Sequence, residues 1–430
     1  MKVNIVTLGC SKNVVDSENV AGHLSRNGIE VRFDSNRTDW DICIVNTCGF
    51  IGDAKIESIN TLLELVQVKQ RGRKPRKIIA VGCLIERYKK ELKAEIPEID
   101  AFYGVHEWKQ LIQSIVDSQW QSLASERLQS TPRHYAYLKI SEGCNRSCSY
   151  CAIPLIRGKH VSRPIDDLVA EAKDMVAQGV QEIIVIAQDT TYYGMDLYGR
   201  RCLGELLERL ATETRAPWIR LHYTYPTSFP TDAIEVMQRH PNICNYIDIP
   251  LQHINSNILK SMQRGIDREG TLALLQQFRQ LMPDVAIRTT LIVGYPGEGE
   301  DEYQELKQFV AEAQFDRMGV FAYSPEEGTP SYHLGDPIDE EIKQQRIDEL
   351  MAIQEKISLA KNEAKIGRTF KTLIDRREGE FYIGRTEYDS PEVDDEVVVS
   401  SDKPLHVGRF YNVTITDAME NDLMGCVEES

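Results

Sequence analysis

The stretch Ser141-Glu-Gly-Cys144-Asn-Arg-Ser-Cys148-Ser-Tyr-Cys151 is the most informative part of this 430-residue chain. It places three cysteines within eight residues, on one loop. Soft thiolates at this spacing can ligate three irons of a 4Fe-4S cluster, which leaves the fourth iron without a protein ligand. The stretch therefore predicts an open metal site at which chemistry can occur.

A structural zinc site is the alternative interpretation of these cysteines. His160 or a more distant side chain would then complete a tetrahedron of mixed cysteine and histidine ligands. Zinc ligands usually come in pairs spaced Cys-x2-Cys, whereas this loop combines Cys-x3-Cys with Cys-x2-Cys. The loop alone leaves both alternatives open, and the chain that follows it favours the cluster.

After Cys151, apolar strands alternate with amphipathic helical segments, of which the first is expected at 165–178. Short and nearly continuous apolar runs are typical of parallel strands that are buried on both faces. Six strands follow this pattern: 136–140, 182–187, 218–223, 246–251, 285–293 and 317–322. Six β/α units are too few for a closed eight-stranded barrel, so the sequence predicts an α/β fold with an open six-unit barrel. Its functional loops should gather at the carboxyl ends of the strands.

Three more cysteines each follow a predicted strand near the N-terminus. Cys10 follows a strand at 3–8, Cys48 a strand at 42–45, and Cys83 a strand at 78–81. The carboxyl ends of strands in a doubly wound parallel sheet share one edge, so these residues are expected to converge. We interpret them as a second three-cysteine cluster site. The alternative for any one of them is plain burial, which is common for free cysteine.

The remaining four cysteines have no partners at ligand spacing. Cys43 lies within its predicted strand and is most simply a core residue, and burial is also the default for Cys202, Cys244 and Cys426. The N-terminus runs straight into a strand without a signal peptide, and no apolar stretch reaches membrane-spanning length. A cytoplasmic protein is expected, in which the thiols stay reduced.

Length and composition indicate several domains. A chain of 430 residues predicts two or three domains, and 42% hydrophobic residues suffice for packed cores. A long charged helix at about 339–366 precedes alternating runs with frequent turns, which predict a small β-barrel. The stretch Gly408-Arg-Phe-Tyr-Asn-Val-Thr-Ile-Thr resembles the TRAM domain, an RNA-binding barrel. The expected boundaries are an N-terminal domain at 1–118, a linker at 119–134, the six-unit barrel at 135–366 and the β-barrel at 367–430.

Motifs from all three regions resemble those of the methylthiotransferases, a family of radical S-adenosylmethionine (SAM) enzymes. The resemblance covers essentially the whole chain, and six cysteines match one for one. The matching stretches are Leu8-Gly-Cys-Ser-Lys-Asn, Asn46-Thr-Cys-Gly-Phe, Val81-Gly-Cys, the Cys144 loop with Ile153-Pro-Leu-Ile-Arg-Gly and Ser162-Arg-Pro, and Leu291-Ile-Val-Gly-Tyr-Pro-Gly-Glu. The resemblance implies a transferase that inserts a methylthio group at an unactivated carbon, with two 4Fe-4S clusters and two uses of SAM.

The resemblance also implies a role for each cysteine set. The cysteines of 144–151 would hold the cluster that passes an electron into SAM, supplied by a donor such as flavodoxin or ferredoxin. SAM then breaks to methionine and a 5'-deoxyadenosyl radical, which takes a hydrogen from the substrate. Cys10, Cys48 and Cys83 would hold an auxiliary cluster whose open iron carries the sulfur that is methylated and transferred. The protein positions these groups and excludes water and oxygen, and no further catalytic side chain is assigned.

Other residues of the SAM site are expected in the cluster loop and at strand ends. Tyr150 would lie against the adenine, and Gly294 would let the backbone approach SAM closely. Many radical SAM proteins bind the SAM amine with a Gly-Gly-Glu motif, from which this chain departs, and Gln188 or Thr190 is expected to substitute. Two further polar residues are candidates either for the cavity wall or for a salt bridge or hydrogen bond inside the barrel: Arg220 and Gln252.

Charge bears on which substrate receives the sulfur. Residues 367–430 carry seven basic and fifteen acidic side chains, or −8 of the chain's net −16. RNA-binding surfaces should be basic because phosphate contacts dominate affinity, whereas an acidic surface attracts a basic partner. We therefore expect the family branch that modifies an aspartate of small-subunit ribosomal protein S-twelve at its β-carbon. The alternative is a MiaB-type tRNA adenosine methylthiotransferase, and the acidic run at 389–396 is alternatively a solvated turn.

An iron-sulfur or zinc binding module without turnover, such as a redox sensor, is the alternative from another class. Such a module would need only one metal site. It would leave unexplained the glycine motif at Gly294 and the second cysteine set. The two cysteine sets together therefore favour an enzyme.

Overall fold

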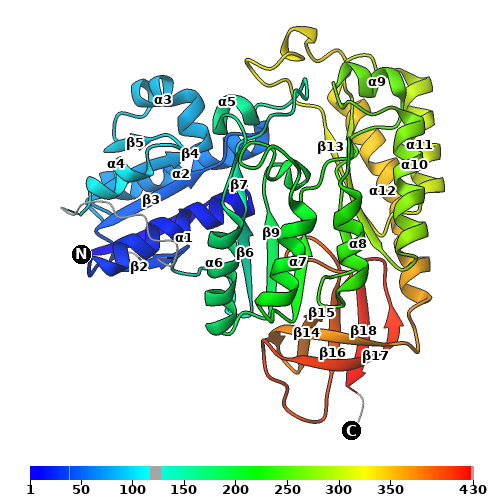
Figure 1. Ribbon diagram of the computed structural model, residues 1–430. Helices are drawn as coiled ribbons and strands as arrows, with labels where there is room; N and C mark the ends of the chain where they lie inside the picture. Colours follow the sequence, from blue (N-terminus) through cyan, green and yellow to red (C-terminus); the bar gives the residue numbers. More distant parts are fainter. Residues whose placement is uncertain (38, 117–126, 428–430) are drawn as a thin grey trace.

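The computed structural model describes residues 1–37, 39–116 and 127–427, and three structural units follow one another along the chain (Figure 1). The first is a parallel sheet, the second an open β/α barrel, and the third a small closed β-barrel. The predicted fold class, α/β with a C-terminal β-barrel, is confirmed. No helix within the described ranges is long and apolar enough to cross a membrane.

The N-terminal sheet is doubly wound, as predicted. Its strands are all parallel, in the order β2-β1-β3-β4-β5: β1 (Lys2–Thr7), β2 (Glu30–Phe33), β3 (Ile42–Thr47), β4 (Lys77–Gly82) and β5 (Ala101–Tyr103). Four helices accompany them: α1 (Ser11–Arg26), α2 (Gly52–Gln70), α3 (Cys83–Glu95) and α4 (Trp108–Gln113). Alternate residues of β3 enter different cores, because Ile44 packs with α1 and α4 while Cys43 and Val45 pack with α2 and α3. The sheet is therefore buried on both faces.

The six predicted β/α units of the barrel are all present. The strands occur in chain order across the barrel: β6 (Tyr135–Lys139), β9 (Glu182–Ile186), β10 (Trp218–Leu221), β11 (Tyr246–Asp248), β12 (Ala286–Val293) and β13 (Arg317–Ala322). Two parallel three-stranded sheets meet at Ile219, which donates to the carbonyl of Asn242 and accepts from the amide of Cys244, each at 2.8 Å. The outer helices are α6 (Ile165–Ala177), α7 (Leu203–Glu213), α8 (Thr231–Arg239), α10 (Arg268–Leu281) and α11 (Glu300–Ala313).

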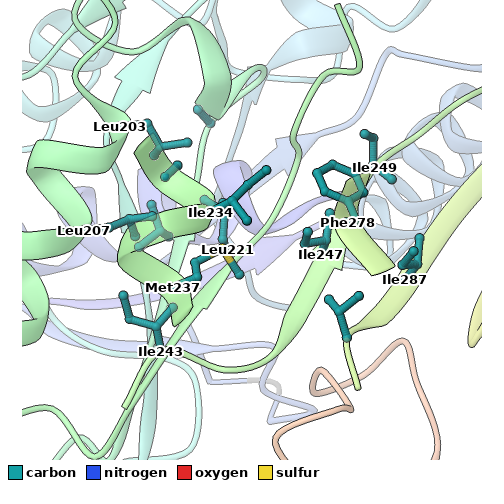
Figure 2. Close-up of a cluster of buried hydrophobic side chains, with 14 of the residues drawn as sticks. Leu203, Leu207, Leu221, Ile234, Met237, Ile243, Ile247, Ile249, Phe278 and Ile287 are labelled. Carbon is teal, nitrogen blue, oxygen red and sulfur yellow. The ribbon is translucent and has the colours of Figure 1, made fainter. Parts of the chain in front are cut away.

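The largest hydrophobic core lies between the barrel strands and their helices (Figure 2). In β10, Ile219 and Leu221 enter this core, whereas Trp218 and Arg220 point to the opposite side. Successive side chains of a strand face opposite sides, so an outward apolar set leaves an inward set free to be polar. The barrel interior can therefore carry charged residues while the outside holds the helices by apolar burial.

The C-terminal barrel closes in the order β14-β15-β16-β18-β17. Its strands are β14 (Thr369–Glu378), β15 (Phe381–Arg385), β16 (Glu396–Ser400), β17 (Phe410–Ala418) and β18 (Asp422–Val427). The predicted long helix is α12 (Glu340–Glu363), which leads into β14. The sequence analysis did not predict β18, β2 or β5. The shorter elements are β7 (Ser141–Glu142), α5 (Ile153–Arg157), β8 (Val161–Ser162), η1 (Thr190–Tyr192), α9 (Ser256–Ser261) and η2 (Tyr332–Leu334).

The three aspartates of the acidic run at 389–396 turn into the six-unit barrel, whereas Glu392 is exposed and Glu396 pairs with Arg376 on the surface. Asp389 is fully buried and pairs with Arg317 of β13 at 2.5 Å, and Asp395 pairs with the same guanidinium at 2.9 Å. Asp394 accepts a hydrogen bond from the Tyr246 hydroxyl at 2.6 Å. Burial raises the pKa of Asp395 to about 6, against the opposing effect of Arg317. For these three aspartates the expectation of a solvated turn is wrong, and they are not free to attract a basic partner.

Arg220 belongs to the same interior charge network. It is fully buried, and its Nε donates to Glu182 at 2.6 Å while its Nη1 donates to the carbonyl of Glu387 at 2.7 Å. Arg385 of β15 also pairs with Glu182, at 2.8 Å. Of the two alternatives for Arg220, the structure supports the interior salt bridge, which lies within the six-unit barrel. The two barrels are joined by the Arg385–Glu182 pair and by the bond from Arg220 to the Glu387 carbonyl.

The predicted domain boundaries, 1–118, 135–366 and 367–430, are retained as a proposal. Of the predicted linker at 119–134, residues 119–126 lie outside the described residues. Arg127 follows directly and pairs with Glu18 of the sheet domain and, at 3.5 Å, with Glu171 of the barrel. The described part of the linker is thus anchored to both domains.

Removing Arg317 should destabilise the protein far more than removing an exposed arginine. Arg317→Met leaves the carboxylates of Asp389 and Asp395 buried without their cation, a change that costs about 3–5 kcal/mol. Arg376→Met removes an ion pair with Glu396 on the surface, which is worth about 0–1 kcal/mol. Thermal unfolding of both variants checks this, and equal melting temperatures would contradict the inward role of the acidic run.

Candidate functional site

Cys10, Cys48 and Cys83 converge at one edge of the N-terminal sheet. Cys10 caps α1 after β1, Cys48 follows β3, and Cys83 begins α3 after β4. Gly9 has a φ of +90°, and a Cβ there would lie 2.8 Å from the Cys48 sulfur, so only glycine leaves room for the Cys48 side chain directly before Cys10. The three thiols also affect one another's pKa, because the charge of Cys10 raises the pKa of both other thiols.

Cys144, Cys148 and Cys151 lie on the loop after β7. Backbone bonds fold this loop: Cys144 donates to the Gly158 carbonyl and Cys151 to the Cys148 carbonyl, each at 3.1 Å. Gly143 has a φ of +75°, and a Cβ there would lie 2.2 Å from the Lys159 carbonyl oxygen. The loop therefore depends on glycine directly before its first cysteine.

Hydrogen-bond donors point at the sulfurs of both sets. Arg157 Nη2 lies 3.4 Å from the Cys83 sulfur, Arg264 Nη1 lies 3.3 Å from the Cys148 sulfur, and the Arg146 amide lies 3.4 Å from the Cys144 sulfur. Such donors stabilise thiolate, the form that ligates iron. The donor set therefore fits a pair of iron-sulfur clusters, each with three protein ligands.

Burial acts against these donors and raises the pKa of most of the thiols. It raises the pKa of Cys83 to about 12 and of Cys144 to about 11, and it also raises those of Cys48 and Cys151. The pKa of Cys10 is lowered instead: burial would raise it, but the charges of Lys12 and Arg157 and two backbone hydrogen bonds outweigh that effect. The thiols would lose their protons on binding metal, whose positive charge stabilises thiolate.

The spacing of these side chains differs from that of a single-ion site. Among the described residues, no three cysteine, histidine, aspartate or glutamate side chains come together as ligands of one metal ion. A cluster distributes its irons, so its cysteines stand farther apart than the ligands of one ion. His160, the candidate fourth zinc ligand, instead bonds Ser162 at 3.1 Å and packs edge-on against Tyr192.

Arg157 of α5 links the two cysteine sets. Besides facing Cys83, its guanidinium donates to Asn13 Oδ1 at 2.6 Å and to Asp16 at 2.8 Å, both on α1. It also donates to Glu142, directly before the cysteine loop, at 3.0 Å. Lys139 of β6 pairs with the same two carboxylates. One buried network of charges therefore fixes the auxiliary cysteine set against the loop of the other set.

A cavity of about 570 Å³ opens between the two cysteine loops. Phe50 and Asp53 line it from the segment after Cys48, and Tyr150 lines it from the second loop. The rest of its wall comes from the carboxyl ends of β12 and β13 and the segments that follow them, including Ile292, Phe321 and Ser324. Its size suits a small-molecule cofactor together with part of a substrate.

The expected SAM residues fall in different surroundings. Tyr150 lines the cavity, and its hydroxyl lies 3.2 Å from Arg264 Nη1; Gln252 also lines the cavity. Gln188 donates to Glu142 at 2.8 Å, and Thr190 donates to the His222 carbonyl at 3.0 Å, so both side chains already have protein partners. The SAM contacts of Tyr150 and Gln188 remain predictions.

Gly294 is required for a reason that the sequence did not reveal. Its φ is +78°, and a Cβ there would lie 2.5 Å from the Lys343 side chain. Lys343 is itself buried and pairs with Asp336 at 2.6 Å. The close approach at Gly294 is therefore made by a lysine of α12, and its predicted approach to SAM stays a prediction.

Three of the four other cysteines are buried core residues, as predicted. Cys43, Cys202 and Cys244 are buried, as expected, and burial raises the pKa of Cys43 to about 12. Cys426 is only half-buried, so the burial default is wrong for it. It lies in β18 of the small barrel, where partly exposed residues alternate with the buried Leu423 and Gly425.

Sequence reasoning missed Arg157, Arg264 and Asn13 as site residues. Arg157 and Asn13 both lie within stretches that carry the family resemblance, and that position was the only signal available for them. Arg264 is buried and packs over the Tyr225 ring at 4.2 Å, but it lies outside those stretches. A cationic partner for a thiolate is recognisable only once the fold brings the two together.

Three family models match successive parts of the chain: the uncharacterized protein family UPF0004 at residues 2–104, the radical SAM superfamily at 138–310 and the TRAM domain at 366–427. The ribosomal protein uS12 methylthiotransferase RimO of Phocaeicola vulgatus is 51% identical over 427 residues, 99% of each chain. That of Bacteroides thetaiotaomicron is 52% identical over 424 residues, 98% of this chain and 97% of the relative. This chain belongs to the RimO family of methylthiotransferases. The predicted family resemblance is confirmed, and each matched region of this RimO-family chain falls on a different unit of the fold, although the radical SAM match ends before β13.

Solved structures share the fold at low identity. The radical SAM methyltransferase TsrM from Kitasatospora setae has a TM-score of 0.56 at 13% identity, covering 77% of this chain and 74% of its own. The cobalamin-dependent enzyme OxsB has a TM-score of 0.52 at 12% identity, covering 82% of this chain and 56% of its own. These likenesses support the arrangement of a parallel-sheet domain beside an open radical SAM barrel.

Replacing one cysteine of either set should remove one cluster and leave the other. Anaerobically reconstituted protein should hold about eight irons, and the Cys48→Ala and Cys148→Ala variants about four each, because the two sets lie on different domains. Iron and zinc analysis of the three proteins measures this. Loss of all iron from either variant, or zinc in place of iron, would contradict two independent cluster sites.

Proposed function

We propose that this RimO-family enzyme adds a methylthio group to the β-carbon of an aspartate in small-subunit ribosomal protein uS12, the S-twelve protein expected above. The observation that carries the proposal is full-length identity of 51–52% to relatives named for this activity. The cavity lined by segments next to both cysteine sets supports it, because the transfer needs both sets near one place.

The bound clusters and SAM would supply the electron transfer, the radical and the sulfur chemistry. The protein's own residues hold and orient these groups. Six cysteines provide the ligands. Arg157 donates to a sulfur of the auxiliary set and Arg264 to a sulfur of the set at 144–151. The buried network around Arg157 keeps the two sites in register, and the cavity walls exclude bulk water from reactive species.

The tRNA alternative is less well supported. The full-length relatives are named for the ribosomal protein, and the C-terminal barrel carries an excess of acidic side chains. Its acidic run, however, is occupied in holding the barrels together, so it does not recruit the substrate. We propose further that a flavodoxin or ferredoxin serves as the electron donor and that tRNA is not modified.

Product analysis separates the two substrates. Reconstituted enzyme with SAM, reductant and sulfide should add about 46 Da to uS12, the mass of a methylthio group that replaces hydrogen, and nothing to tRNA anticodon stem-loops. Mass spectrometry of ribosomal proteins from cells with and without the gene gives the same readout in vivo. Modification of the stem-loops, with none of uS12, would show that the chain is a tRNA methylthiotransferase instead.

Tyr150 should contribute to SAM binding through its ring. Tyr150→Ala should weaken SAM binding by about 1 kcal/mol, on the scale of one aromatic contact, while Tyr150→Phe keeps the ring and most of the affinity. Equilibrium binding of SAM to both reconstituted variants measures this, with iron content as the control. Unchanged affinity in Tyr150→Ala would give Tyr150 a packing role only.

A further inference from the structure

Lys12 is a buried lysine without a carboxylate partner. It lies in the first turn of α1, two residues after Cys10, and only 7% of it is exposed. Its ammonium lies 3.1 Å from the centroid of the Tyr223 ring. No ion pair or hydrogen bond of that ammonium occurs within the described ranges of the chain.

The neighbouring buried cations differ from Lys12 in this respect. Arg157 pairs with Asp16 and Glu142, and Lys139 pairs with the same carboxylates. Burying a cation without an anion is costly, so buried charges are normally paired. Besides the Cys10 thiol, on which its charge acts, the Lys12 ammonium has no anionic partner among the described residues, so its donors are free for an anion from outside the chain.

Tyr223 is held firmly in its position under Lys12. It follows β10 at the carboxyl end of the barrel, with a φ of +54°, an unfavourable value for a tyrosine. Its amide donates to Asp248 at 2.8 Å, and its carbonyl accepts from the Thr190 amide at 3.0 Å. Its hydroxyl lies 3.3 Å from the Ser11 hydroxyl. Tyr223 therefore has a strained backbone conformation at the position where its ring supports the Lys12 ammonium.

We infer that the Lys12 ammonium binds the side-chain carboxylate of the aspartate that is modified. The inference rests on the proposed function. The β-carbon that is modified must lie near the auxiliary cysteine set, and the side-chain carboxylate of the aspartate is bonded to that carbon. An ammonium has three donors and no acceptor, so a carboxylate is its natural partner, and the bond is charge-assisted. A tRNA base carries no such group, so Lys12 is also a specificity residue for a protein substrate.

The test compares two peptides that span the modified segment of uS12, one with the aspartate and one with asparagine in its place. Full-length, anaerobically reconstituted enzyme should bind the aspartate peptide at least tenfold more tightly. Lys12→Gln and Lys12→Met should reduce this preference to less than twofold. Lys109→Gln, which removes an exposed charge from α4 of the same domain, should retain it. Fluorescence anisotropy measures all four proteins.

Two results would overturn the inference. The first is equal affinity of the wild type for both peptides. The second is a Lys12→Gln variant that keeps the full preference for the aspartate peptide. A changed reduction potential of the auxiliary cluster with an unchanged peptide preference would assign Lys12 to that cluster instead. Failure of the proposed function is distinguishable, because then the wild type would not methylthiolate uS12 at all. Iron content confirms that each variant holds both clusters.

Discussion

The arrangement of this enzyme depends on a buried guanidinium that belongs to one domain and binds groups of another. Arg157 extends from the barrel to Asp16 and Asn13 on the sheet domain while it also holds Glu142 beside the cysteine loop. A guanidinium presents its donors in a rigid plane, so these bonds fix direction as well as distance. Because removing one partner would leave other charges buried, the network penalises any slippage of one cysteine set against the other.

The sequence was sufficient for the parts of the fold that depend on local patterns. Six barrel strands followed from continuous apolar runs, and Cys10, Cys48 and Cys83 could be grouped because parallel strands end at one edge. The short strands β2, β5 and β18 were missed, whereas the equally short β10 and β11 were marked by the regular alternation of strands and helices along the barrel. The partners of Arg220 and Gly294 were also beyond reach, because Glu182 and Lys343 are distant in sequence and are brought close only by the folded barrel.

The acidic run at 389–396 shows where arguments from net charge fail. A sum over residues assumes that charges face solvent, whereas Asp389, Asp394 and Asp395 are buried against the amino ends of barrel strands. Paired charges of this kind add little to the field outside the protein. The predicted preference for a protein substrate is supported by the relatives, but the charge of these buried aspartates does not contribute to it.

The interface around the cavity is polar on both sides. Glu326, which lines the cavity after β13, accepts from Lys55 at 2.9 Å and from Arg87 at 2.5 Å, both on helices of the sheet domain. Apolar packing has no preferred direction and lets one domain slide against the other, whereas ion pairs of this geometry resist such sliding. Two cysteine sets on separate domains can act on one carbon atom only if their separation is fixed. The Arg157 network and the ion pairs of Glu326 meet that requirement with directional bonds between the two domains, and they leave the cavity open for cofactor and substrate.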